Sequence, residues 1–299
     1  MGLELTSPRR GSRWERWLTR PKLTFFFTLF FLAQATLFLG LEATPGMLDR
    51  LGQVRGRDFL QFYIAGRIVA RSDVDRLYDQ EHFREVQQSL VEINEKCPPY
   101  FSIYPPQVAL LFSPFGGWSY ENAILTWWLI QVACFWCAGS MLFQLLKPPP
   151  SWRWTAALGL AAFYPVLNTF WNGQLSGLVL LFFVTGLELH RRQRPFLAGG
   201  MLSLLAMKPQ LALGVVVWLL LRRDGRTLAG LCFGGLVQVA VVCLTMSPRV
   251  LPAYAQATRF YPDLFRMQFF SPDHQHAVAG LLKNLPGGPS DEWSLGSSD

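Results

Sequence analysis

The chain has 299 residues, of which 51% are hydrophobic and only 16% are charged. In soluble domains about a quarter of the residues are charged. The low charge of this chain and its long apolar blocks exclude an ordinary soluble domain. The formal net charge of +7 comes from short basic clusters beside apolar segments, a pattern that indicates membrane topology and not nucleic-acid binding. We therefore expect an all-α, polytopic membrane protein.

The first predicted span covers residues 23–41, an uncharged block of the length that a bilayer requires. It is too long for the hydrophobic part of a signal peptide, and no small-residue cleavage site follows it. Basic residues outnumber acidic ones in the preceding segment, residues 1–22. Because basic loops stay on the inner side of a membrane, we expect this N-terminal segment to be cytoplasmic.

A long outer loop, residues 42–106, follows this span. Apolar residues recur at helical spacing over residues 59–71, and residues 79–93 are predicted to form a second, polar helix. Both helices could lie along the membrane surface. The other loops of the chain are short, so the length of this one predicts a functional role.

The next apolar segment, residues 107–118, is short for a span, and we expect that it does not cross. Clear spans follow at residues 121–146, 154–171, 175–190 and 228–246. Residues 196–221 are interrupted at Lys208-Pro209-Gln210 and are expected to form a hairpin of two half-helices.

This layout places the basic turns on the cytoplasmic side. The residues concerned are Lys147, Arg153, Arg191, Arg192, Arg194, Arg222, Arg223 and Arg226. The long loop, residues 172–174, residues 208–210 and segment 247–280 then converge on the other side. If residues 107–118 did cross, this order would invert. The polar tail, residues 286–299, is expected to be disordered, which leaves residues 23–285 as the membrane domain.

Asp58 stands at the start of the apolar helix in the long loop. It could be the N-cap of this helix, or a general base that takes a proton from a hydroxyl group at the membrane surface. Asp73 and Asp75 form a paired acid motif that could bind a divalent metal with a phosphate, or only begin a turn. The sequence indicates no other cofactor.

Lys208 lies among Leu, Ala and Met, where an unpaired charge is costly. Pro209 breaks the helix beside it, and broken helices at membrane depth line cavities. A cation there would suit a lipid phosphate, although it could also pair with an acid in a full span. Asn172 and Gln174, between two spans, could bind a substrate or belong to a plain turn.

Two further segments carry candidate binding residues. Tyr104 opens the Tyr-Pro-Pro sequence that enters the next apolar segment in an extended conformation. His274, Gln275 and His276 lie in the last outer segment, where the alternative is a polar loop without function. The chain has no Walker loop, no dinucleotide-binding glycine motif and no zinc-protease motif. If the protein uses a sugar donor, we therefore expect this donor to be membrane-borne.

Several short motifs, in their order and spacing, resemble those of glycosyltransferase family 87. They are Asp58-Phe59 with Tyr63 and Ala65-Gly66, Leu77-Tyr78-Asp79, Tyr104-Pro105-Pro106 with Pro114, Gly173-Gln174, Ala198-Gly199-Gly200, Lys208-Pro209, and His274-Gln275-His276-Ala277 through Gly280-Leu281-Leu282. The resemblance extends over residues 20–285. It departs at His274 and His276, where the family is usually closer to Asn-Gln-Ser.

The resemblance implies a GT-C transferase that uses a polyprenyl-phosphate sugar, typically mannose, and inverts the anomeric centre. It assigns the catalytic acid of the first outer loop to Asp58 and the lysine of the family's Lys-Pro position to Lys208. The implied partners are the donor, the lipid bilayer of the cell membrane, and a glycan, glycolipid or protein acceptor. Family members commonly continue through further spans, so we expect this chain to be short at its C-terminal end.

Two other functions fit the sequence. A lipid or solute transporter also has an intramembrane lysine and broken helices, but it does not need an acid in a large first loop. A non-catalytic membrane partner is favoured by the short C-terminal end.

Overall fold

The computed structural model describes residues 18–259. The predictions for residues 1–17, for His274, Gln275 and His276, and for the tail lie outside this range. The described chain consists of helices and loops, and its β-structure is limited to two isolated bridges. The predicted all-α fold is therefore confirmed. The described residues divide into two compact units, residues 18–63 with 118–239 and residues 64–117 with 240–259.

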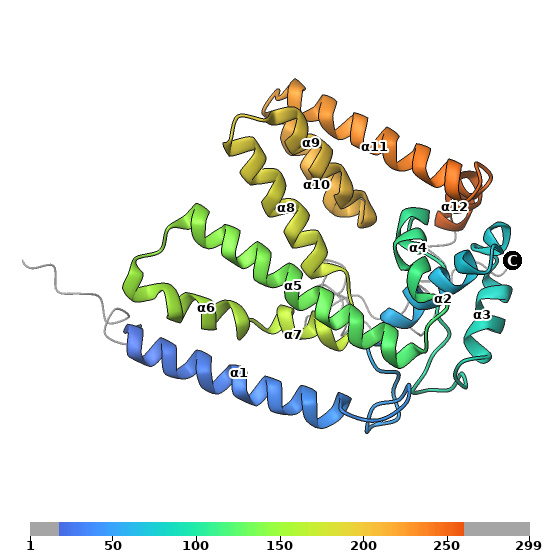
Figure 1. Ribbon diagram of the computed structural model, residues 1–299, viewed down its shortest axis with the longest axis horizontal. Helices are drawn as coiled ribbons and strands as arrows, with labels where there is room; N and C mark the ends of the chain where they lie inside the picture. Colours follow the sequence, from blue (N-terminus) through green and yellow to red (C-terminus); the bar gives the residue numbers. More distant parts are fainter. Residues whose placement is uncertain (1–17, 260–299) are drawn as a thin grey trace, which may run out of the picture. The chain divides into compact units, whose positions relative to one another are not determined.

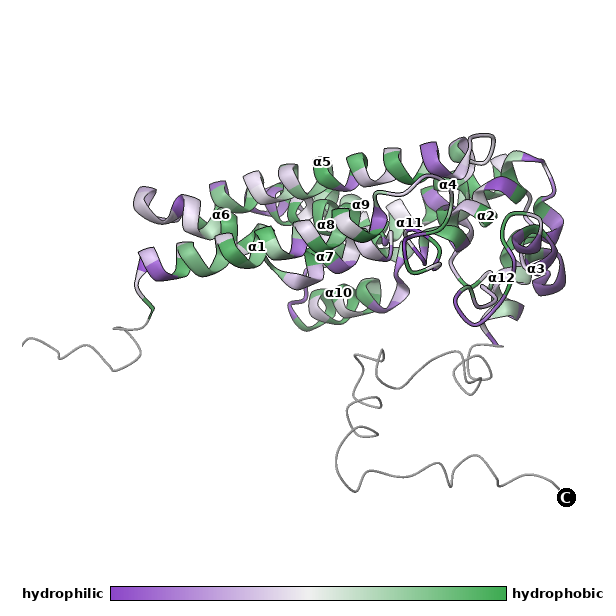
Figure 2. Ribbon diagram, turned by 90° about the horizontal axis from the view of Figure 1, so that it is seen from below, coloured by the Kyte–Doolittle hydropathy of each residue, from purple (hydrophilic) through white to green (hydrophobic). Residues whose placement is uncertain are grey.

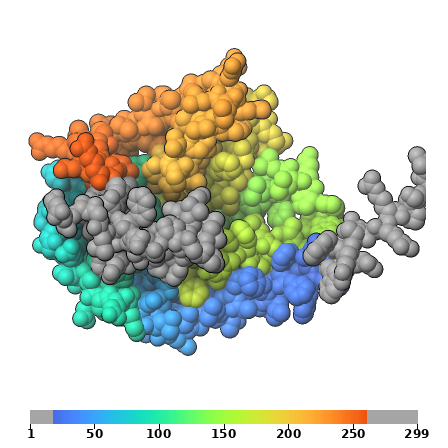
Figure 3. All heavy atoms as spheres, turned by 180° about the vertical axis from the view of Figure 1, so that it is seen from behind, coloured from blue at the N-terminus to red at the C-terminus, as the bar shows by residue number. Residues whose placement is uncertain are grey.

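The first unit is a bundle of helices (Figure 1). It contains α1 (Arg20–Glu42), α5 (Tyr120–Leu146), α6 (Arg153–Ala161), α7 (Tyr164–Trp171), α8 (Ser176–Arg191), α9 (Pro195–Ser203), α10 (Pro209–Leu221), most of α11 (Gly225–Thr245), and the short 3-10 helices η3 (Pro150–Trp152) and η4 (Leu204–Met207). Helix α5 packs on α8, α8 packs on α9, and α1 packs on α6 and α7. Figure 3 shows the blue atoms of α1 against the yellow-green atoms of α6 and α7.

Three of these helices, α1, α5 and α11, are long and apolar enough to cross a membrane. Their outer faces carry large exposed apolar side chains, such as Phe25, Trp136 and Leu244. In water such faces would be unfavourable, whereas in lipid they are the expected surface. Figure 2 shows hydrophobic residues along α1 and α5 and hydrophilic residues gathered on α3. The protein is therefore a membrane protein.

The basic turns lie at one end of the first unit. The Arg20 guanidinium donates to the Ser151 carbonyl at 2.8 Å, so α1 begins beside the turn that follows α5. Helices α5 and α8 run in the same direction, because the Gly177 N–H at the start of α8 donates to Gln131 of α5, while Thr185 further along α8 contacts Met141 near the end of α5. The ends of α5 and α8 therefore share the end of the bundle at which α1 begins.

The turn before α11 also lies at this end. Asp224 is 3.6 Å from His190 Nδ1 and accepts a 2.6 Å hydrogen bond from the Thr227 hydroxyl. Arg191 and Arg192 both donate to Glu188. The two arginine-rich turns, which were predicted to lie on the same side, are thus joined by side-chain contacts.

The prediction of one span over residues 154–171 is wrong. The segment forms two short helices, α6 and α7, separated at Ala162 and Phe163. Pro165 is near the start of α7 and has no N–H to continue the α6 helix. The Ala162 carbonyl, released from the helical pattern, accepts a 2.8 Å hydrogen bond from the buried Gln34 amide of α1. This bond stabilises a break that would be costly in lipid.

The predicted interruption of residues 196–221 is confirmed at Lys208. Helices α9 and η4 lead to Lys208, and α10 leads away from it. Glycines allow α9 and α11 to approach closely: a Cβ on Gly199 would lie 1.9 Å from the Thr227 carbonyl oxygen, and one on Gly230 would lie 1.9 Å from that of Phe196. Small residues at such contacts are a common device for packing helices in membranes.

The second unit holds the outer-loop helices. It contains most of α2 (Phe59–Ala70), η1 (Val74–Arg76), α3 (Gln80–Gln88), α4 (Pro106–Phe112), η2 (Ser113–Phe115) and α12 (Val250–Thr258), while the first residues of α2 belong to the first unit. The predicted helix over residues 59–71 is confirmed. The predicted helix over residues 79–93 is too long, because the Gln87 side chain bonds Pro98 and Tyr100 and the chain turns back after it.

Helix α4 has seven residues and is therefore about 10 Å long, far less than a bilayer requires. Its residues Val108, Ala109 and Phe112 are buried in protein. The segment 107–118 therefore forms α4, η2 and a turn, and not one helix of membrane length. Helix α12, within the outer segment 247–280, was not predicted.

Candidate functional site

Three predicted site residues meet in the first unit. Asp58 precedes α2, Gln174 lies in the turn between α7 and α8, and Lys208 lies between η4 and α10. The Gln174 amide nitrogen donates to Asp58 Oδ2 at 2.8 Å, and the Lys208 ammonium donates to Gln174 Oε1 at 3.2 Å. The amide thus presents its donor to the anion and its acceptor to the cation, which is the orientation that satisfies both. We call these three residues the acid–amide–lysine cluster.

A glycine brings the Gln174 turn against the start of α2. Gly173 has a φ of +60°, in the left-handed region that favours glycine. A Cβ at this position would lie 2.5 Å from the Cβ of Phe59 and 2.8 Å from the Gly56 carbonyl oxygen. The Gly173 carbonyl also accepts a 2.9 Å hydrogen bond from the buried indole of Trp127. The close approach that lets Gln174 reach Asp58 therefore depends on a residue without a side chain.

A proline determines where Lys208 points. Pro209 is the first residue of α10, where its missing N–H costs no helical hydrogen bond. Lys208 in front of it has φ −124° and ψ 88°, outside the helical region. The chain therefore leaves the helix at Lys208, and its side chain reaches the turn before α8 instead of lying along α10.

Asp58, Gln174 and Lys208 are all partly exposed. Burial raises the pKa of the Asp58 carboxyl above its ordinary value, while the Gln174 hydrogen bond and the charges of Lys208 and Arg57 act in the opposite direction. The Asp58 side chain accepts a hydrogen bond from Gln174, a contact that an N-cap role does not require.

The cluster lies at the end of the bundle opposite the basic turns. Helix α8 begins two residues after Gln174 and ends at Arg191. Helix α10 begins directly after Lys208 and ends before Arg222. Each helix therefore has one end at the cluster and the other at an arginine-rich turn.

Among the described residues of the first unit, Asn172 does not join the cluster. The Asn172 amide turns back to its own helix and donates to the backbone and side-chain oxygens of Asn168, at 3.1 and 2.8 Å. Tyr104 lies in the second unit, where its carbonyl accepts a 2.8 Å hydrogen bond from the Tyr78 hydroxyl. Of the two amides predicted from the sequence, Gln174 contacts Asp58 and Lys208, whereas Asn172 contacts Asn168.

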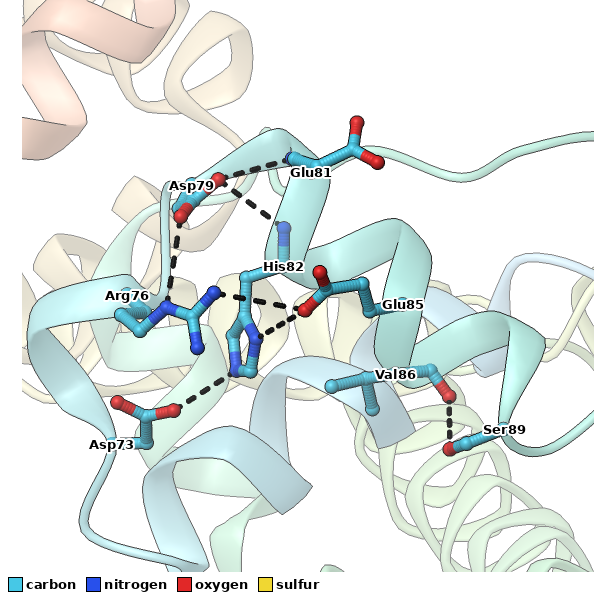
Figure 4. Close-up of polar contacts among 8 residues, drawn as sticks. All are labelled: Asp73, Arg76, Asp79, Glu81, His82, Glu85, Val86 and Ser89. Carbon is cyan, nitrogen blue, oxygen red and sulfur yellow. Dashed lines mark hydrogen bonds and ion pairs between the residues drawn. The ribbon is translucent and has the colours of Figure 1, made fainter.

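The paired acids of the loop belong to a cluster of charges on the surface of the second unit (Figure 4). We call it the surface ion cluster, and it consists of Asp73, Arg76, Asp79, His82 and Glu85. His82 Nε2 lies 2.9 Å from Asp73 Oδ2, and His82 Nδ1 lies 3.3 Å from Glu85. Asp75 lies in η1. Over residues 18–259, no three potential ligand side chains are grouped in a way that could hold a metal ion.

Sequence reasoning did not single out Arg57 and Trp171, which flank the cluster. The Arg57 guanidinium lies over the Trp171 ring, 5.6 Å from its centroid. The available signal was closeness in the sequence: Arg57 directly precedes Asp58, and Trp171 lies three residues before Gln174.

The membrane-length helices and the polar cluster at one end of the bundle define a polytopic membrane protein with a candidate site for a charged substrate. The chain matches the model of glycosyltransferase family 87 over residues 102–288, more than half of its length, and belongs to this family. It is therefore a membrane glycosyltransferase, with a sugar donor and an acceptor as its substrates. No curated protein and no solved structure matches the chain. The matched region contains Gln174 and Lys208 and begins after Asp58.

Proposed function

We propose that this glycosyltransferase moves a sugar, most simply mannose, from a polyprenyl phosphate to an acceptor hydroxyl, with inversion at C1. The observation that carries the proposal is the bridge made by Gln174 between the Asp58 carboxylate and the Lys208 ammonium. A transferase of this type needs a base for the acceptor and a cation for the departing phosphate, and the cluster offers both groups within one contact network.

In the proposed reaction, Asp58 accepts the proton of the acceptor hydroxyl as its oxygen attacks C1 of the sugar. The bond between C1 and the phosphate oxygen breaks, and its electron pair leaves with the polyprenyl phosphate. Lys208 stabilises the charge that grows on this phosphate. Gln174 holds the base and the cation in register and can exchange its bonds with them for bonds to the substrate. A single displacement of this kind inverts the configuration at C1.

We propose that the cluster faces the non-cytoplasmic side. The basic turns at the ends of α5, α8 and α10 mark the cytoplasmic end by the positive-inside rule. The cluster lies at the opposite end of the bundle. In this arrangement the N-terminal segment 1–22 is cytoplasmic, and residues 23–285 are the catalytic membrane domain of a multi-pass protein of the cell membrane.

The experiment that tests the proposal is sugar transfer from radiolabelled polyprenyl-phosphate mannose in membranes that contain the wild type or Asp58→Asn. A membrane extract of the native host supplies acceptors. We expect transfer by the wild type and its loss in the variant at equal expression. Transfer that persists in the variant would remove Asp58 as the base, and the absence of transfer by the wild type would remove the proposed donor. Parallel reactions with a chelator or added divalent cations test for a metal requirement.

A topology assay tests the proposed side. Accessibility reporters placed at residues 172 and 208 should both label from the non-cytoplasmic side, and one at residue 192 should label from the cytoplasm. Labelling of residues 172 and 208 from different sides would contradict the proposed site.

A further inference from the structure

Arg57 combines two unusual features beside the cluster. Its φ is +23°, a conformation in the left-handed half of the map that residues with a side chain rarely adopt. Its guanidinium lies over the Trp171 ring, in the geometry of a cation–π contact. Strained backbone persists where surrounding contacts enforce it, and it is frequent at functional sites.

The contacts of Arg57 join two segments that are far apart in the sequence. Its guanidinium also donates to the Gln53 side chain within the same loop. Trp171 is the last residue of α7, and the next three residues lead to Gln174. The ring contact therefore connects the peptide that carries Asp58 with the peptide that carries Gln174, independently of the hydrogen bond between those two side chains.

Arg57 and Trp171 can contact each other by stacking but not by a hydrogen bond, because both side chains are hydrogen-bond donors. Arg57 Nε and Trp171 Nε1 are both enclosed by protein, and neither has a hydrogen-bond partner among residues 18–259. Burial of such donors is unfavourable unless another interaction offsets it. A planar guanidinium on an aromatic face is such an interaction, and lysine does not reproduce it.

We propose that Arg57 and Trp171 form a cation–π clasp that positions Asp58 against Gln174, so that Arg57 is a positioning residue of the transferase. This inference rests on the proposed function. The charged groups that act on Asp58 are Arg57 and Lys208. The carboxylates that act on Arg57 are Asp58 and Glu42, at the end of α1.

The clasp makes Arg57 act in two ways, through its shape and through its charge. Loss of the shape loosens Asp58 and lowers kcat, by roughly tenfold if the base moves by a fraction of an ångström. Loss of the charge removes a group that keeps the pKa of Asp58 down. Since the base must be ionised, the acidic limb of the pH–rate profile then moves to higher pH.

The test compares Arg57→Gln, Arg57→Lys, Trp171→Leu, Trp171→Phe and the double variant Arg57→Gln/Trp171→Leu. We expect Arg57→Gln to lower kcat and to move the acidic limb of the pH–rate profile to higher pH. Arg57→Lys should return this limb to its wild-type pH but should recover only part of kcat. Trp171→Leu should lower kcat with a smaller change in the limb, and Trp171→Phe should retain most activity. The double variant should be about as impaired as Arg57→Gln alone, because both changes break one contact.

A second readout does not require turnover. Hydrogen–deuterium exchange of the peptide around residues 53–60 in the purified protein should increase in Arg57→Gln and in Trp171→Leu, and no further in the double variant. The matched control is Arg50→Gln, an exposed arginine of the same loop, which should leave both exchange and transfer at wild-type values. Unchanged exchange in Arg57→Gln, or losses that multiply in the double variant, would overturn the clasp. Increased exchange in the two single variants, together with no transfer by the wild type, would support the clasp and refute the proposed donor.

Discussion

The acid–amide–lysine cluster and the surface ion cluster contain similar groups, but they are built in different ways. In the first, the two hydrogen bonds join residues 116 and 34 positions apart in the sequence. In the second, all members lie within residues 73–85, and Arg76, Asp79 and Glu85 have side chains that are 47%, 44% and 58% exposed. Neighbouring charges on an exposed helix pair because local geometry brings them together, and such pairs contribute little to stability.

This difference helps to decide which carboxylate is assigned the catalytic role. Asp58 and Asp73 were both candidates from the sequence. Asp73 is engaged by His82 on the surface of the second unit, whereas Asp58 is held by an uncharged amide next to a lysine in a partly buried site. Desolvation makes electrostatic interactions stronger at the partly buried Asp58 than at the exposed surface, so substitutions in the acid–amide–lysine cluster should have larger effects.

The largest difference in transfer rate is expected between variants of the two acids, Asp58 and Asp73. Asp58→Ala should lower the rate of sugar transfer by at least about 100-fold, because a positioned base contributes that much or more. Asp73→Ala should stay within about twofold of the wild type, because its side chain is 39% exposed and its contact with His82 has no part in the proposed reaction. Initial rates at saturating donor, normalised to protein in the membrane, check both. Equal losses in the two variants would erase the distinction between the clusters.

Lys208 should come next. Lys208→Met is expected to lower kcat/KM roughly 10- to 100-fold through the loss of charge stabilisation at the leaving phosphate. The Lys208 charge also lowers the pKa of Asp58, so its removal raises this pKa, and the acidic limb of the pH–rate profile moves to higher pH. Lys208→Arg retains the charge and serves as the matched control, with the limb unchanged. If the acidic limb does not move in Lys208→Met, the charge of Lys208 does not act on the base Asp58.

Gln174 should have a smaller effect, because it carries no charge and positions the other two residues. Gln174→Leu is expected to reduce kcat by roughly tenfold and to move the acidic limb upward, since the Gln174 hydrogen bond stabilises ionised Asp58. The matched control is Asn172→Leu, a nearby amide whose bonds go to Asn168. We expect this control to keep the wild-type pH–rate profile. The same shift in both variants would show that the whole turn, and not the bridge, is responsible.

The smallest effect is expected at the surface ion cluster. His82→Ala breaks the contacts with Asp73 and Glu85 and removes a side chain that is only 14% exposed, and it should lower the free energy of unfolding by roughly 1–2 kcal/mol. Thermal unfolding of the purified protein should therefore change by only a few degrees, and the transfer rate should not change. A large loss of transfer at unchanged stability would give the surface ion cluster a functional role.

Several elements could be predicted because their signals are local. Uninterrupted apolar blocks predicted the helices that became α1, α5, α8 and α11. Lys208-Pro209 predicted the interruption, because proline cannot continue a helix from the preceding turn. Pro165 carried the same signal within residues 154–171, but the apolar composition on both sides outweighed it. Gln34, which bonds the carbonyl at this break, lies on another helix and could not have indicated it.

The sequence by itself determined the all-α membrane class, the family, the break at Lys208 and the identity of Asp58, Gln174 and Lys208 as polar exceptions, because composition, periodicity and proline act locally along the chain. Only the tertiary structure decided which polar residues meet. It joined Gln174 to Asp58 and Lys208, turned Asn172 back onto α7 and placed Arg57 on Trp171. These outcomes depend on the close approach at Gly173 and on a strained backbone at Arg57. Long-range packing imposes both features, so no local pattern could have predicted them.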